Sequence, residues 1–185
     1  VVPLSLFAAS HVKNDVPLAV QRARSEHDGL TVNNGAHLGI HPALVDLLDD
    51  RAATVERELG VDRSTDDVLV VLCARGSSDP DANGDVFKLA RLLDEGRDFA
   101  GVDAAFIGVT EPELSDALHA AAKRRPDAVV VLPYMLGDGV LTGRIRDGAD
   151  EFDAEYPYVD AAAGDPLGTD SRLLDVLGDR WQAAR

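Results

Sequence analysis

His11 is the first residue of the chain that could carry acid–base or metal chemistry. It follows the apolar run Val1–Phe7, which predicts a buried strand end, and precedes a helical pattern over Asp15–His27. A neutral imidazole titrates near neutral pH and binds cobalt, nickel and iron. A side chain between a strand and a helix lies at the sheet edge where α/β proteins bind ligands. We therefore interpret His11 as a candidate base and metal ligand, with a helix-capping or core histidine as the alternative.

Three polar residues follow His11 and have two possible roles. Lys13, Asn14 and Asp15 could orient His11 or contact a carboxylate of a substrate. Asn14 or Asp15 could equally cap the following helix, because Asn and Asp side chains accept hydrogen bonds from free N–H groups at a helix start. The sequence leaves both interpretations open.

A second candidate site is the turn Arg75-Gly76-Ser77-Ser78. It follows an apolar strand and leads into a helix expected over Asn83–Glu95. Backbone N–H groups in such a turn suit an anion, so Arg75, Ser77 and Ser78 could hold one. The alternative is a tight turn with Asp79 or Asn83 as its cap. The turn is no P-loop, because no Gly-Lys-Ser/Thr follows.

Two further histidines, His37 and His41, lie four residues apart. On a helix this spacing would place both on one face, where they could bind a metal ion. An intervening glycine and a following proline instead favour a structural loop that leads into a helix. The remaining histidines, His27 and His119, lie in helical patterns and are expected on the surface.

Strand and helix patterns alternate along most of the chain. This order predicts a parallel sheet with helices on both faces, which is an α/β fold. Expected strands after Val1–Phe7 are Leu30–Val32, Val68–Cys73, Val102–Val109, Ala128–Leu132 and Val159–Ala162. Expected helices after Asp15–His27 are Pro42–Leu59, Asn83–Glu95, Pro112–Arg124, Gly143–Glu155 and Ser171–Ala184.

The chain also contains an internal repeat. Val1–Val12 is similar to Leu132–Leu141, and the segment around His37-Leu38-Gly39 is similar to that around Pro166-Leu167-Gly168, both at an offset of roughly 129 residues. His11 in the first copy corresponds to the apolar Val140 in the second. We expect the first module to occupy residues 1–62 and to be incomplete, and a complete second module to occupy residues 63–185. A repeat that changes its chemistry in this way suggests that only the first copy is catalytic.

Composition excludes several classes of partner. The formal net charge of -15 disfavours nucleic acid and anionic membranes, which need a basic surface. Solubility at high salt or a GC-rich genome is enough to explain this negative charge. The single cysteine, Cys73, excludes an internal disulfide framework, suits the cytoplasm and is expected to be a small buried residue. The chain starts without Met inside an expected strand, so we expect that an upstream piece is missing.

Several segments together resemble a known family. Phe7-Ala8-Ala9-Ser10-His11-Val12-Lys13-Asn14-Asp15-Val16-Pro17, Leu38-Gly39-Ile40-His41-Pro42, Val71–Asn83 and Phe106–Pro112 resemble motifs of the class II tetrapyrrole chelatases. These are the sirohydrochlorin cobaltochelatases and ferrochelatases of the CbiX type. The resemblance covers nearly the whole chain. It implies a chelatase-like, flavodoxin-like fold with two related modules.

The resemblance also implies a reaction and a set of site residues. The expected reaction is insertion of Co2+ into sirohydrochlorin, toward cobalamin, with Fe2+ toward sirohaem, or Ni2+, as alternatives and with no organic cofactor. His11 would be the base and metal ligand, and Lys13, Asn14, Arg75, Ser77 and Ser78 would bind the polycarboxylate substrate. A non-catalytic tetrapyrrole- or metal-binding module is one rival. A structural subunit that forms a homodimer is another.

One catalytic residue that the resemblance implies is not among these residues. The family's first module opens with a Gly-His-Gly-Ser loop whose histidine is a second catalytic and metal-binding residue. Its counterpart in the second module is Arg75, whose guanidinium stays protonated and has no lone pair for a metal ion. These 185 residues alone are therefore not expected to contain the whole active site.

Overall fold

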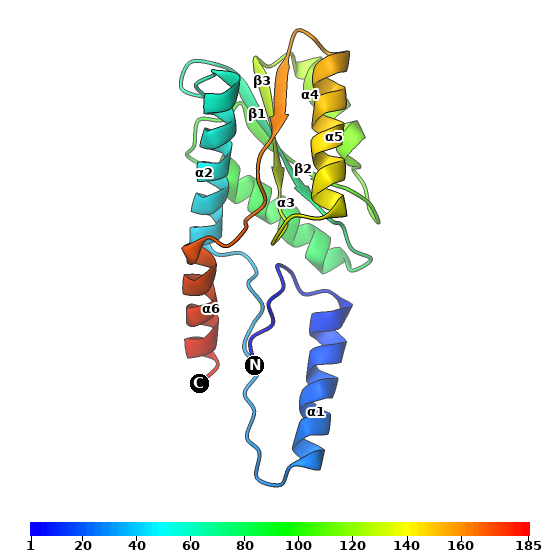
Figure 1. Ribbon diagram of the computed structural model, residues 1–185, viewed down its shortest axis with the longest axis vertical. Helices are drawn as coiled ribbons and strands as arrows, with labels where there is room; N and C mark the ends of the chain where they lie inside the picture. The colour runs from blue at the N-terminus through cyan, green and yellow to red at the C-terminus, as the bar shows by residue number, and fades with distance from the viewer.

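Four parallel strands form the centre of the wider, upper part of the molecule (Figure 1). The computed structural model describes residues 1–185. The strands lie in the order β2-β1-β3-β4 and span Gly101–Phe106, Val68–Ala74, Ala128–Pro133 and Asp160–Ala163. β1 is buried along its whole length because β2 and β3 flank it and helices cover both faces. The predicted parallel α/β architecture is confirmed.

Two pairs of helices cover the two faces of this sheet. α2 (Pro42–Leu59) and α3 (Pro80–Asp94) pack on one face, and α4 (Leu114–Arg124) and α5 (Val140–Glu155) pack on the other. Alternate residues of β1 point to opposite faces, so Val70 and Leu72 meet the first pair and Leu69 and Val71 meet the second. Both faces of β1 are therefore buried.

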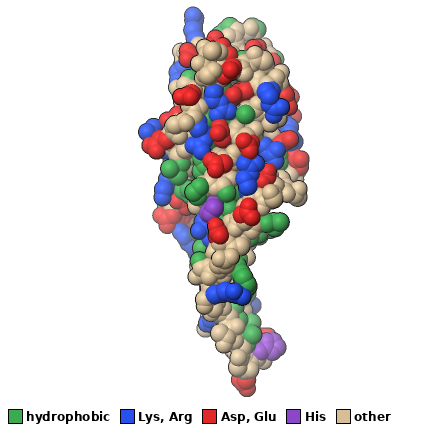
Figure 2. All heavy atoms as spheres, turned by 90° about the vertical axis from the view of Figure 1, so that its left-hand side faces the viewer, with side chains coloured by type: hydrophobic (Ala, Val, Ile, Leu, Met, Phe, Trp, Pro, Cys, Tyr) green, Lys and Arg blue, Asp and Glu red, His purple; other side chains and the backbone are tan.

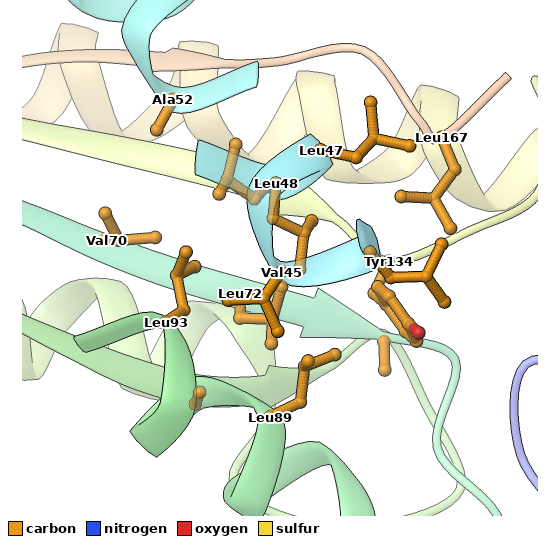
Figure 3. Close-up of a cluster of buried hydrophobic side chains, with 14 of the residues drawn as sticks. Val45, Leu47, Leu48, Ala52, Val70, Leu72, Leu89, Leu93, Tyr134 and Leu167 are labelled. Atoms are coloured by element: carbon orange, nitrogen blue, oxygen red, sulfur yellow. The ribbon is translucent and has the colours of Figure 1, made fainter. Parts of the chain in front are cut away.

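The larger core lies between the sheet and α2 and α3 (Figure 3). Val45, Leu48 and Ala52 of α2 point toward Val70 and Leu72 of β1. Fully burying one such aliphatic side chain stabilises a fold by about 1.5–3 kcal/mol. The strand ends near the candidate site therefore rest on a rigid layer.

The lower part of the molecule is a narrow arm. It contains η1 (His11–Asp15, a π-helical turn), α1 (Val16–Glu26), α6 (Ser171–Ala183) and two extended segments, residues 1–7 and 28–41. The expectation of regular strands at Val1–Phe7 and Leu30–Val32 is wrong. Residues 1–6 pair in parallel with residues 33–39 only at Val1 and again at Ser5 and Leu6. No continuous ladder forms, because Pro3 has no N–H and the Ser5 N–H donates to the Pro3 carbonyl.

The internal repeat is visible in the backbone of the structure. The Leu38 N–H donates to the Ser5 carbonyl in the arm, and the Leu167 N–H donates to the Met135 carbonyl in the upper part. The next residues, Gly39 and Gly168, both have a left-handed backbone. Helical segments begin at residues 129 positions apart, at His11 and Val140 and again at Pro42 and Ser171. The residues at 11 and 140 are thus structurally equivalent.

The last helix of each copy packs against the other copy. α2 follows the arm in sequence but covers the sheet of the upper part, and α6 lies along the arm segment 35–40. Two arginines make this exchange reciprocal. Arg51 of α2 donates to the Leu167 carbonyl at 3.2 Å, and Arg180 of α6 donates to the equivalent Leu38 carbonyl at 2.7 Å. The division into modules at residues 62 and 63 stays a prediction.

Several element boundaries differ from the prediction. β2 ends at Phe106 rather than at Val109, because Val109 has a φ of 71°, which no strand tolerates. α3 begins at Pro80 because the Asp79 side chain caps it, and α5 begins at Val140. β4 and α4 are displaced by one and two residues at their starts, to Asp160 and Leu114. The helix expected from Asp15 begins instead with the π-helical turn at His11.

The molecular surface mixes charges of both signs. On the face that carries α2, acidic and basic side chains lie side by side (Figure 2). None of the helices is both long and apolar enough to cross a membrane.

The reciprocal arginines generate the first prediction. Arg180→Met should lower the free energy of unfolding by about 1–3 kcal/mol, because the buried Leu38 carbonyl would lose a charged donor. Urea unfolding followed by circular dichroism measures this change. Arg144→Met removes the same charge from an exposed position and should unfold as the wild type does. Equal midpoints for both variants would contradict the role of Arg180.

Candidate functional site

A cleft of about 480 Å³ lies where the arm meets the upper part. Residues 4–12 of the arm form one wall, and residues 74–78, at the carboxyl end of β1, form the other. The cleft lies at the edge where parallel α/β sheets bind ligands. It brings together four of the predicted site residues, which are His11, Arg75, Ser77 and Ser78.

His11 is held by a carboxylate one helical turn later. Its Nδ1 atom lies 2.6 Å from Oδ2 of Asp15, and both side chains are mostly exposed, at 89% and 64%. An ionised carboxylate only accepts hydrogen bonds, so Nδ1 carries the proton and donates it to Asp15. The lone pair of Nε2 is then free for a metal ion or a proton. Such an outer carboxylate fixes the ring and makes it a better ligand.

The π-helical turn positions this pair. The Val16 N–H donates to the His11 carbonyl, which is the i to i+5 bond of a π-helix. Such single turns are often found at functional sites. Asn14 and Asp15 make no capping hydrogen bond to α1, so the capping alternative is wrong for both. Asp15 instead orients His11, which is one of the two roles that the sequence left open for this segment.

The opposite wall is a braced turn. The Asn83 side chain accepts from the Ser77 N–H at 2.9 Å and donates to the Ser77 carbonyl at 2.7 Å. The Asp79 N–H donates to Ser77 Oγ, and the Asp79 carboxylate caps α3. The tight turn capped by Asp79 is therefore confirmed. Arg75 is exposed and makes no ion pair or side-chain hydrogen bond, so its guanidinium is available to an anion in the cleft.

Beneath this wall, the loop after β1 at Gly76 packs closely against the loop after β2 at Gly108. Gly76 has a φ of 83°, and a Cβ atom there would collide with the carbonyl oxygen of Gly108. Val109 follows with its exposed side chain on the cleft rim and a φ of 71°. A β-branched residue in this conformation is strained, and such strain is typical of ligand sites. The sequence pattern gave no sign of this strain.

Lys13 and Asn14 do not line the cleft. The Lys13 ammonium lies 2.6 Å from Oδ2 of Asp79 and 3.0 Å from Oδ2 of Asp81. Asn14 is exposed and makes no side-chain hydrogen bond. Their predicted contact with a substrate carboxylate therefore has no support in the geometry.

The floor of the cleft is apolar, and the sequence analysis missed it. Phe7 packs against Tyr134 with ring centroids 5.2 Å apart and ring planes tilted by 38°, and Leu136 also lines the cleft. Tyr134 is buried, and burial raises the pKa of its hydroxyl group. A tyrosine at the end of an otherwise aliphatic strand was the signal that could have identified this floor.

The other histidines and the cysteine have structural roles. His41 caps α2 through Nδ1, which accepts from the Ala43 N–H, and its Nε2 lies 3.2 Å from Asp179. The structural interpretation of His41 is thus confirmed. His37 is half-buried, and burial lowers its pKa. Cys73 is buried as predicted, which raises the pKa of its thiol to about 12.

No cluster of three or more potential metal-binding side chains exists in these residues. His11 therefore stands alone as an exposed imidazole at the cleft. A second cleft of about 480 Å³, between α4 and α5, includes His119 and several carboxylates but none of the predicted site residues.

Comparison with known proteins identifies the family. The sequence profile of the CbiX family matches residues 1–55 and 69–184. The chain belongs to the CbiX family. It is 29% identical over 180 residues to a sirohydrochlorin cobaltochelatase of Priestia megaterium, covering 97% of this chain and 58% of that protein. It is 32% identical over 155 residues to a sirohydrochlorin ferrochelatase of the same organism, covering 84% and 56%.

The fold of this CbiX family member is that of a solved chelatase. SirB from Bacillus subtilis with Fe3+ superimposes with a TM-score of 0.84 at 26% identity, covering 99% of this chain and 69% of SirB. The predicted chelatase-like fold and the family resemblance are confirmed. The chain spans less than three fifths of the length of both Priestia relatives.

The packing at Gly76 generates a second prediction. Gly76→Ala should lower the free energy of unfolding by more than about 1 kcal/mol, because the new Cβ atom meets a carbonyl oxygen at a left-handed position. Gly84→Ala is the matched control, since its Cβ atom would meet open space inside α3 and should stabilise the helix by up to about 1 kcal/mol. Urea unfolding of both variants measures the two shifts. A neutral Gly76→Ala would show that the two loops are not packed as described.

Proposed function

We propose that this chain carries part of the active site of a sirohydrochlorin chelatase and that the cleft between the two repeats binds the tetrapyrrole. The metal that we propose is Co2+, and His11 is its ligand and the base. The observation that supports the proposal is the cleft itself, with His11 on one wall and Arg75, Ser77 and Ser78 on the other. The relatives named sirohydrochlorin chelatases support the substrate.

The walls of the cleft suit the two parts of such a substrate. Phe7, which packs on the buried Tyr134, and Leu136 offer apolar contacts to a flat macrocycle. Arg75 and the hydroxyl groups of Ser77 and Ser78 offer hydrogen bonds to peripheral carboxylates. Because the protein has a net charge of -15, an anionic substrate needs such a local cation to overcome the overall repulsion.

His11 can serve both steps of metal insertion in turn. Metal insertion exchanges a divalent cation for two pyrrole protons. With Nδ1 bonded to Asp15, Nε2 first holds the incoming cation. Once the cation moves to the ring nitrogens, the freed Nε2 accepts one pyrrole proton, and solvent water takes the other. A single imidazole holds a cation loosely, which suits a metal ion that must leave as part of the product.

Iron is the second candidate metal. The Priestia ferrochelatase is 32% identical to this chain, against 29% for the cobaltochelatase, although it aligns over fewer residues. Imidazole binds both ions, so the ligand set does not favour either. Initial rates of insertion with Co2+, Fe2+ and Ni2+ at equal concentrations rank the three metals. A higher rate with Fe2+ than with Co2+ would identify the activity as that of a ferrochelatase instead of a cobaltochelatase.

The rest of the proposed function follows from the family and the composition. We propose that no organic cofactor takes part, that the divalent metal is a substrate, and that the protein acts in the cytoplasm. Residues 1–62 and 63–185 would be the two modules.

Association into a homodimer along the unpaired edge of residues 1–7 is an alternative arrangement. Light scattering of the natural full-length protein distinguishes such a dimer from a monomer.

The role of His11 generates the third prediction. His11→Ala should slow Co2+ insertion at least about a hundredfold, as expected when a positioned base is lost. The absorbance change of sirohydrochlorin measures the rate in the natural full-length protein, after subtraction of the spontaneous reaction. His27→Ala removes an exposed histidine at the end of α1 and should leave the rate unchanged. Equal rates in His11→Ala and the wild type would exclude His11 as the base.

The role of Arg75 generates the fourth prediction. Arg75→Met should raise the KM for sirohydrochlorin about tenfold, because a charge-assisted hydrogen bond to a carboxylate is lost. Steady-state kinetics at fixed Co2+ measures KM, with Arg144→Met as the control for the charge change. An unchanged KM would remove Arg75 from the substrate site. Binding of sirohydrochlorin without turnover in the wild type would instead favour the non-catalytic tetrapyrrole-binding module.

A further inference from the structure

One lysine links the segment that carries His11 to the upper part of the molecule through two ion pairs. Lys13 reaches from η1 to the start of α3, where its ammonium meets Asp79 at 2.6 Å and Asp81 at 3.0 Å. No other ion pair or hydrogen bond links residues 8–27 to residues 68–185. α1 also lacks a sheet or a second helix to pack on, so Lys13 is the main polar restraint on this segment.

Asp79 connects this restraint to the opposite wall of the cleft. Its carboxylate caps α3, its N–H donates to Ser77 Oγ, and Asn83 clamps the backbone of Ser77. The Asp79 side chain is only 15% exposed, whereas that of Asp81 is 83% exposed, so Asp79 is the better shielded partner. The ion pair lowers the pKa of Asp79 and raises the pKa of Lys13, and both groups stay charged at neutral pH.

We propose that Lys13 is a positioning residue that holds the cleft at its working width by tying η1 to Asp79. Lys13 then acts through Asp79 and not by binding a substrate carboxylate, and this assignment rests on the proposed function of the cleft. Lys13 lies two residues after His11, and Asp79 lies one residue after Ser78. The ion pair therefore sets the distance between His11 and the turn that carries Arg75.

The restraint should affect substrate binding more than the chemical step. When the ion pair is absent, η1 and α1 sample wider positions, and only the closed fraction binds the substrate productively. The apparent affinity for the substrate falls in proportion to the fraction of molecules that are closed. A substrate that is already bound still meets the same His11, so the rate of the chemical step is unchanged. The difference in apparent affinity between the wild type and a variant without the ion pair should also decrease as salt screens the pair.

The test follows the two helices that continue from the walls of the cleft. Spin labels on Gln21→Cys of α1 and Lys88→Cys of α3, both exposed positions, report the distance between these helices in the natural full-length protein. Cys73 is buried and stays unlabelled. Lys13→Met should broaden the distance distribution and shift it to longer distances. The same change of charge in Lys123→Met, at an exposed position on α4, should leave it unchanged.

Two further variants separate a tether from a general loss of stability. Asp79→Asn keeps the helix cap but loses the charge, since Asn caps as well as Asp. It should broaden the distribution by no more than Lys13→Met does, because Asp81 still meets the ammonium, and the double variant should be no broader than Lys13→Met alone. Lys13→Arg should restore the wild-type distribution. At about 1 M salt, where the Debye length is about 3 Å, the wild type should approach Lys13→Met, which should itself respond little.

Kinetics links the tether to function. Lys13→Met should raise the KM for sirohydrochlorin about two- to fivefold, the range of an exposed ion pair, and leave kcat unchanged. An unchanged distance distribution in Lys13→Met, or equal broadening in Lys123→Met, would overturn the tether. A broadened distribution with an unchanged KM would overturn its positioning role. If the wild type shows no insertion activity, the proposed function fails, and the distances alone still decide the tether.

Discussion

The structure depends on the reciprocal exchange of α2 and α6 between the two copies of the repeat. Each helix buries its apolar side against the other copy, and each sends one arginine to the equivalent buried carbonyl, that of Leu167 or Leu38. A charged donor on a buried carbonyl is costly to remove, because the carbonyl would stay buried without a partner. This constraint fixes the arm against the upper part. The cleft then forms at the junction of the two copies.

The two copies keep the same backbone and differ in the side chains at the cleft. His11 and Val140 both begin a helical segment, yet only His11 has a carboxylate one turn later to orient it. The second copy contributes an arginine, two hydroxyl groups and the apolar floor around Tyr134. Under the proposed function, the first copy supplies the metal ligand and the second supplies most of the substrate contacts. Lys13 and Asp79 connect these two contributions across the cleft.

Much of the fold could be predicted from the sequence, because apolar runs and helical periodicity are local signals. The all-apolar Val68–Cys73 and Ala128–Leu132 identified the two inner strands, and the offset of roughly 129 residues identified the repeat. The cleft position of His11 and of the 75–78 turn followed from the rule that parallel sheets bind ligands at their carboxyl edge. Pairings between distant residues could not be predicted. Lys13 and Asp79 are separated by more than sixty residues, α2 packs on the sheet of the other copy, and the strain at Val109 depends on its tertiary surroundings.

The proposed function requires that the metal ion reaches the tetrapyrrole through His11 at the cleft between the repeats. Its most direct test is nuclear magnetic resonance of the full-length protein with 15N-labelled histidines, titrated with paramagnetic Co2+ in the presence of sirohydrochlorin. These 185 residues contain five histidines, and the spectra of the five single His→Ala variants assign their signals among those of the full-length protein. The ring signals of His11 should shift and broaden first, while those of His27, His37, His41 and His119 should not. First broadening at His119, in the acidic cleft between α4 and α5, with an unaffected His11 would contradict it.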